Sequence, residues 1–73
     1  MMTNSYSLMN RYGKYTVQKS TPDSVKKWYI RSIYRGEITW TSDPTYSKSW
    51  NYETAMWYLR NLRADDPNCD EDY

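Results

Sequence analysis

The chain has 73 residues, enough for one domain, and a formal net charge of +1 at neutral pH. A domain of this size buries only about 60% of the surface of its unfolded chain, so its stability is marginal. Histidine is absent and cysteine occurs once, which excludes Ser–His and Cys–His catalytic pairs and an intramolecular disulfide. With one cysteine and no apolar run long enough for a membrane span, we expect a cytosolic protein.

The aromatic residues are nine Tyr and four Trp, with no Phe. Tyr and Trp combine a large apolar body with a polar group, and both are enriched at interfaces. Strong aliphatic residues are few, so several aromatic side chains must fill the core. The remainder are expected to form a binding surface.

Charge is divided unevenly along the sequence. Residues 1–63 hold all ten basic and four acidic residues, a net charge of +6, whereas residues 64–73 hold five acidic ones. A basic body favours binding to a polyanion or to an acidic protein surface. We predict that residues 65–73 are a disordered acidic tail, with competition for the basic body's ligand as the alternative.

Residues 1–13 show no clear period and are predicted to be a flexible N-terminal arm. The arm either docks on a partner or packs on the domain's own sheet, and both possibilities remain open. Its apolar and basic side chains are candidate partner contacts, because aromatic residues, Met and Arg dominate small interfaces. These candidates are Tyr6, Ser7, Leu8, Met9, Arg11 and Tyr12.

Three strands are predicted next, over residues 14–19, 25–35 and 37–41. Each alternates side chains or is rich in β-branched and aromatic residues. Arg35-Gly36-Glu37 is typical of a tight hairpin turn. The predicted fold is therefore a three-stranded antiparallel sheet that ends near residue 41.

One C-terminal helix is predicted from residue 52, because apolar residues recur at 52, 55, 56, 59 and 62. Asn51 precedes them as a helix N-cap, and Pro67 marks the end. The helix covers one face of the sheet, which gives an α+β domain over residues 14–64 with the order strand, strand, strand, helix.

Strict alternation along residues 25–35 divides the side chains between the two faces of the sheet. Trp28, Ile30 and Tyr34 are predicted to face the helix, whereas Lys27, Tyr29, Arg31 and Arg35 form a basic outer face. An aromatic platform with cations suits a nucleic acid or an acidic protein patch, and a merely solvated face is the alternative. Among the aromatic residues, the predicted core members are Trp28, Tyr34, Trp40 and Tyr52, and the predicted surface members are Tyr6, Tyr12 and Tyr29.

The sequence has no zinc-ligand set, no calcium-loop pattern and no glycine-rich phosphate loop. We therefore predict a non-enzymatic binding protein without metal or cofactor. The predicted order of strands and helix over residues 14–63, with Tyr-Glu-Thr-Ala-Met-Trp at 52–57, resembles small integrase-arm and plant transcription-factor domains that bind DNA through their sheet. This resemblance implies direct DNA or RNA binding.

A second resemblance rests on the N-terminal Met-Met-Thr-Asn-Ser-Tyr-Ser-Leu-Met, the short length, the basic body and the acidic end. Together they resemble the small transcription regulators of lytic phages that infect plant-pathogenic bacteria. This resemblance implies a monomer in the host cytosol that binds bacterial RNA polymerase near the N-terminus of its largest subunit, beside the RNA exit channel. It further implies inhibition of initiation and suppression of termination, with nascent RNA or DNA as a further contact.

Overall fold

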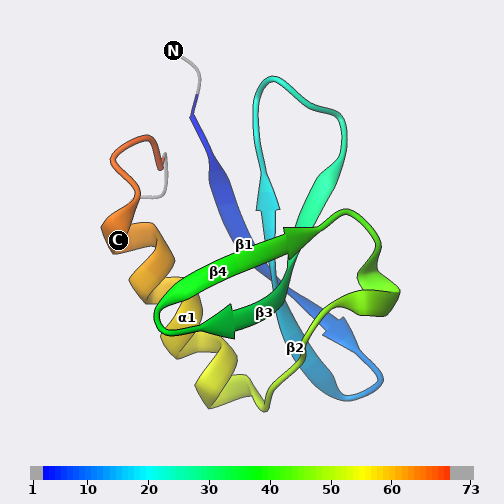
Figure 1. Cartoon of the computed structure of the whole chain (residues 1–73). Helices are drawn as coiled ribbons and strands as arrows, with labels where there is room; N and C mark the ends of the chain where they lie inside the picture. The colour runs from blue at the N-terminus through cyan, green and yellow to red at the C-terminus, as the bar shows by residue number, and fades with distance from the viewer. Residues whose placement is uncertain (1–2, 70–73) are drawn as a thin grey trace.

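The computed structural model describes residues 3–69 as a four-stranded antiparallel sheet with one C-terminal helix (Figure 1). The strands lie in sequence order, β1-β2-β3-β4. The α+β class is confirmed, but the sheet has four strands rather than three. The elements are β1 (Ser5–Arg11), β2 (Lys14–Ser20), β3 (Lys27–Tyr34), β4 (Glu37–Thr41), the short 3-10 helix η1 (Pro44–Tyr46) and α1 (Tyr52–Asp65).

The additional strand is β1, and it consists of residues that were predicted to be an arm. β1 pairs with β2 along its whole length, from Ser5 opposite Ser20 to Arg11 opposite Lys14. A flexible arm is therefore wrong for these residues, and the alternative left open, packing on the domain's own sheet, holds: Tyr6 is 3% exposed and belongs to the core. Leu8 also packs on the core, and the apolar Met9 directly after it hides the alternation in the sequence.

Two hairpin turns connect β1 to β2 and β3 to β4, and each places two consecutive residues at positive φ. The angles are 53° and 84° at Tyr12 and Gly13, and 52° and 82° at Arg35 and Gly36. Paired positive φ angles define the turn that best matches the twist of antiparallel strands, and glycine adopts them without steric cost. The second turn confirms the prediction, whereas the first was missed within the predicted arm.

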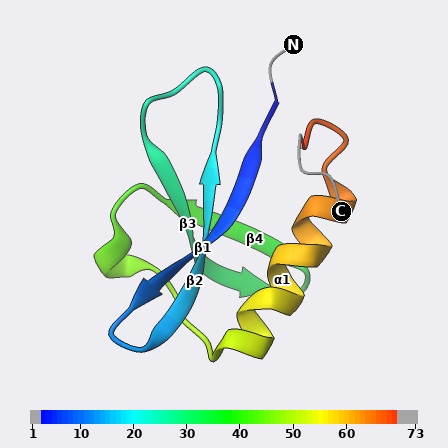
Figure 2. The ribbon, with the colours of Figure 1, turned by 180° about the vertical axis from the view of Figure 1, so that it is seen from behind.

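Helix α1 begins as the sequence predicts. The Asn51 side chain accepts a hydrogen bond from the Thr54 N–H at 2.8 Å, which confirms the N-cap. Ala55 and Leu59 are buried, and the helix ends at Asp65, two residues before Pro67. α1 lies against β1 and β2, so it covers the same face of both strands (Figure 2).

The buried core consists of Tyr6, Val17, Ile30 and Leu59. A register shift between Ile30 and Ser32 interrupts the alternation of β3, so that Ile30 and Ile33 both contribute to the core side. An extra residue of this kind re-aims every side chain that follows it in the strand.

Four predictions about aromatic residues are wrong, those for Tyr6 and Tyr34 as a result of β1 and the bulge. Tyr34 and Tyr52, predicted for the core, are 69% and 55% exposed, whereas Tyr6 and Tyr29, predicted for the surface, are buried. Trp40 packs on the core as predicted, and Trp28 is half-buried.

The segment after α1 differs from the predicted disordered tail over residues 65–69. Asp65 is the last residue of α1, and Asp66 caps the helix with its N–H bonded to the Leu62 carbonyl. Asn4 and Cys69 form an isolated parallel bridge, so this segment lies beside the start of the sheet. The rest of the predicted tail, residues 70–73, lies outside the described residues, as do residues 1–2 of the predicted arm.

Candidate binding surface

The predicted partner contacts of residues 6–12 divide between the two faces of β1. Tyr6 is buried in the core and is not open to a partner, and Leu8 is partly buried against the same core. Ser7 is exposed, and Met9 and Arg11 are partly exposed. Tyr12, at the hairpin turn, is 95% exposed. What remains of this candidate site is therefore the outer side and the turn of the β1–β2 hairpin.

The predicted basic face does not form one patch. Lys27 begins β3 and donates a hydrogen bond to the Ser20 hydroxyl at 2.9 Å, whereas Arg35 lies in the turn at the other end of the strand. Eight residues of extended chain separate them by roughly 26 Å. Tyr29 is only 8% exposed, so it offers no open ring for stacking. Of this set, Arg31 and Arg35 remain exposed beside an aromatic ring.

Arg31 and Arg11 each act on the turn that contains η1, Arg31 on the ring of Tyr46 and the charge of Arg11 on Asp43. The Arg31 guanidinium lies 5.9 Å from the centroid of the Tyr46 ring, and Tyr46 is 64% exposed. The guanidinium of Arg11 lies 5.6 Å from the centroid of the Tyr12 ring. Figures 1 and 2 both place η1 near the turn of the β1–β2 hairpin. We call Arg11, Tyr12, Arg31 and Tyr46 the tip surface.

Asp43 holds the η1 side of the tip surface in place. Its carboxylate accepts hydrogen bonds from the Thr45 hydroxyl at 2.7 Å and from the Thr45 N–H at 3.0 Å. These bonds, with a smaller contribution from the charge of Arg11, lower the pKa of the Asp43 carboxyl. The carboxylate is therefore ionised at neutral pH, and it links Arg11 electrostatically to the turn that presents Tyr46.

The tip surface combines two cations with two exposed phenol rings. Each guanidinium lies within about 6 Å of a ring centroid, the range in which a cation is attracted to an aromatic face. Arg and Tyr are the residue types that most often supply the binding energy of small interfaces. Sequence reasoning included Arg11, Tyr12 and Arg31 but left Tyr46 unassigned, because η1 follows a turn with no strand or helix period.

The second hairpin carries the same chemistry at another place. Arg35 lies 5.3 Å from the centroid of the Tyr34 ring. Its turn lies beside α1, away from η1, in both views of the fold (Figures 1 and 2). The chain thus offers a matched Tyr–Arg pair outside the tip surface.

A partly buried hydrogen-bond cluster ties β1 to the end of α1 and has a structural role. The Tyr6 hydroxyl and the Asn4 amide donate to one oxygen of Asp66 at 2.6 and 2.9 Å, and the Asn68 N–H donates to the other at 2.8 Å. These bonds, the one from Tyr6 foremost, lower the pKa of the Asp66 carboxyl. Burial, and then the neighbouring carboxylate, raise the pKa of the Tyr6 hydroxyl.

The substitution Asp66→Asn should reduce the loss of stability in acid. Because the folded pKa of Asp66 is lowered, its contribution is present above the unfolded pKa, near 4, and is lost as pH falls through the folded value. We expect Asp66→Asn to cost about 1 kcal/mol at neutral pH. Urea unfolding between about pH 6 and pH 2 measures both effects. Tyr6→Phe should also make the free energy of unfolding depend less on pH over this range. An unchanged pH dependence in both variants would contradict this role of Asp66.

Residues 3–69 contain no group of three or more Cys, Asp and Glu side chains placed to hold a metal ion. Within the same residues, no helix has the length and apolar character needed to cross a membrane. Comparison with family models, with curated proteins and with solved structures gave no match.

Proposed function

We propose that the protein is a non-enzymatic regulator that binds bacterial RNA polymerase through the tip surface, inhibits initiation and suppresses termination. The partner comes from the resemblance of the sequence to small phage transcription regulators, which also suggests a monomer in the bacterial cytosol and a contact near the N-terminus of the largest subunit. The observation that supports the tip surface is Tyr12, which is 95% exposed at the turn with Arg11 beside its ring.

An exposed aromatic ring at such a turn contributes little to folding. Positive φ is disfavoured for a tyrosine, and 95% exposure means that the Tyr12 ring has few contacts within the domain. Aromatic side chains have few rotatable bonds and lose little entropy on binding, and Arg adds hydrogen bonds and charge, so the two types often dominate small interfaces. Partner binding accounts for a tyrosine at this position better than stability does.

The double substitution Arg11→Gln and Tyr12→Asn tests the proposal without disturbing the turn, because Asn tolerates positive φ. We expect affinity for purified RNA polymerase from a plant-pathogenic bacterium to fall about thirtyfold, equivalent to about 2 kcal/mol. Fluorescence anisotropy of the labelled chain measures binding. Promoter-initiation and terminator read-through assays should lose their response in parallel.

The second hairpin provides the control for this experiment. The double substitution Tyr34→Thr and Arg35→Asn removes one Tyr and one Arg from a matched turn, and should change affinity less than threefold, or about 0.6 kcal/mol. Equal losses in the two variants would rule out docking at the tip surface. Wild-type protein that does not bind the polymerase would reject the proposed partner.

A second candidate function is direct binding of RNA or DNA, favoured by Arg31 over the exposed ring of Tyr46. Base stacking on an aromatic ring beside a cation is a common way to hold single strands. In the same anisotropy assay, free RNA or duplex would then bind with a strong salt dependence, and Arg31→Gln would reduce the slope by about one. Tyr29, the ring that would stack on bases in the predicted basic face, is buried, so that face does not support this function.

A further inference from the structure

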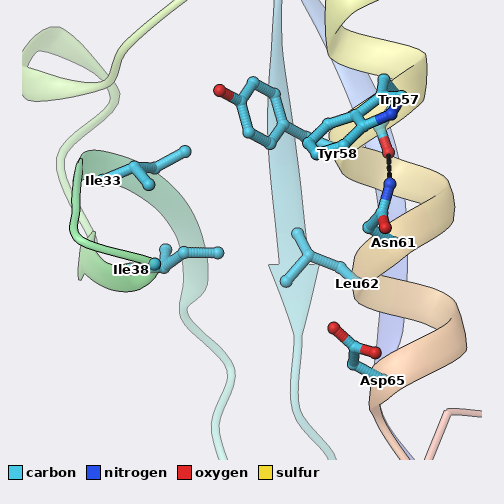
Figure 3. Close-up of a pocket in the computed structure, with 8 residues that line it drawn as sticks. Ile33, Ile38, Trp57, Tyr58, Asn61, Leu62 and Asp65 are labelled. Carbon is cyan, nitrogen blue, oxygen red and sulfur yellow. Dashed lines mark hydrogen bonds between the residues drawn. The ribbon is translucent and has the colours of Figure 1, made fainter.

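An apolar groove runs between α1 and the β3–β4 hairpin, away from the tip surface (Figure 3). Its volume is about 330 Å³, at the lower end of the range for pockets that bind small ligands or side chains. Ile33 and Ile38 form the hairpin wall, and Figure 3 shows both side chains pointing toward α1. On the helix wall, Tyr58 and Leu62 point back toward the hairpin.

The helix wall continues past the apolar part of the groove at both ends. Trp57 lines one end and is 60% exposed, and Asp65 lines the other end. They are eight residues apart on α1, roughly 12 Å along the helix axis at 1.5 Å per residue. Asn61 lies between them, and its amide donates to the Trp57 carbonyl at 2.7 Å. The groove is therefore about two helical turns long, with an anchor-type aromatic ring at one end and a carboxylate at the other.

The charge at the Asp65 end is negative for three reasons. Asp65 itself is exposed, and Asp66 follows it with a pKa lowered by its hydrogen bonds from Tyr6 and Asn4. Both lie at the C-terminal end of α1, where the helix dipole adds partial negative charge. No basic side chain is among the residues that line the groove itself, and a cation near this end, Lys19, lines the adjoining hollow with Asp65 and Asp66. An occupant with a basic group at this end would be favoured, and one with an acidic group disfavoured.

We propose that this groove binds an amphipathic helix of a partner protein, with apolar side chains on successive turns and a Lys or Arg that reaches Asp65. Two helical turns of groove match the spacing of apolar anchors on a partner helix, which recur every three or four residues. The exposed Trp57 supplies an aromatic contact at one end of the groove, and Trp is a residue type that often contributes much of the binding energy of small interfaces. Asp65 then selects the orientation and the charge of the bound helix.

The probe is a synthetic amphipathic peptide of about 14 residues, a length at which helices begin to be stable. One version carries leucines on successive turns flanked on both sides by arginine, and a second carries glutamate in place of arginine. Both are titrated into the ¹⁵N-labelled full-length protein and followed by NMR. We expect shifts at Trp57, Asn61 and Ile38, with the arginine peptide binding about fivefold more tightly than the glutamate peptide.

Charge reversal on the protein distinguishes specific recognition from nonspecific hydrophobic binding. Asp65→Lys should invert the preference, so that the glutamate peptide binds more tightly. Trp57→Ala should weaken both peptides about tenfold or more, whereas Tyr34→Thr, which removes an exposed ring outside the groove, should leave both unchanged.

Three results would overturn the proposal. One is an absence of shifts at the groove with either peptide. Another is an equal affinity for both peptides in the wild type and in Asp65→Lys. The third is a concentration-dependent shift at the groove without peptide, which would assign this surface to a second copy of the chain. None of these outcomes depends on RNA polymerase, so they can be distinguished from a failure of the tip surface.

Discussion

We expect a chain that begins at Gly13 to be unfolded. The deletion removes β1, and with it the buried Tyr6 ring from the core and the Tyr6 hydroxyl from Asp66. It also removes the Tyr6 carbonyl, which accepts a hydrogen bond from Arg63 on α1 at 2.9 Å. A fully buried aromatic side chain alone contributes about 3–5 kcal/mol. Small domains have a total stability of roughly 0.05–0.15 kcal/mol per residue, or about 4–11 kcal/mol for a chain of this length.

Circular dichroism and the amide dispersion of an NMR spectrum measure this outcome. The truncated chain should show no cooperative thermal transition, whereas the full-length Arg11→Gln and Tyr12→Asn variant should keep one near that of the wild type. A truncated chain that folds would mean that residues 3–12 are an accessory arm after all. Deletion of these residues is therefore a poor test of partner binding, because a chain that does not fold would also fail to bind.

The signals that predicted β3, β4 and α1 are local, which is why they were reliable. Gly36 after a strand favours a hairpin turn, and the Asn51 cap with apolar spacing over 52–62 favours a helix. The bounds of β4 and the start of α1 agree with these patterns. The four-stranded sheet was missed because Tyr12-Gly13 occupies a turn that looks, in sequence, like the end of an arm.

The candidate site was less predictable because it depends on contacts distant in sequence. A one-residue bulge after Ile30 cannot be read from the strand pattern, and it alone moves Ile33 to the core side and Tyr34 to the surface. The approach of Arg31 to Tyr46 depends on the path of the chain after β4. That path is fixed in part by the bond from the Lys48 N–H to the Ile30 carbonyl at 2.8 Å.

The burial of Ile30 leads to the second large effect on stability. Ile30 is 0% exposed, lies in the central strand β3 opposite Trp40, and belongs to the core with Val17 and Leu59. Ile30→Ala removes buried methyl and methylene groups and leaves a cavity, and such substitutions cost about 2–5 kcal/mol. The melting temperature should fall by roughly 8–40 °C, because 1 kcal/mol corresponds to about 4–8 °C in a domain of this size.

Two further variants make the Ile30→Ala result specific to packing. Ile30→Val should cost only about 0.5–1.5 kcal/mol, because it removes one methylene group. Thr16→Val should instead stabilise the fold. Thr16 is also 0% exposed, and its hydroxyl has no hydrogen-bond partner within residues 3–69. Replacing a buried, unpaired hydroxyl with a methyl group should stabilise the fold by about 1 kcal/mol. Equal destabilisation by all three substitutions would show that the core of the sheet tolerates no change at either position. Cavity formation would then not be the cause of the stability loss in Ile30→Ala.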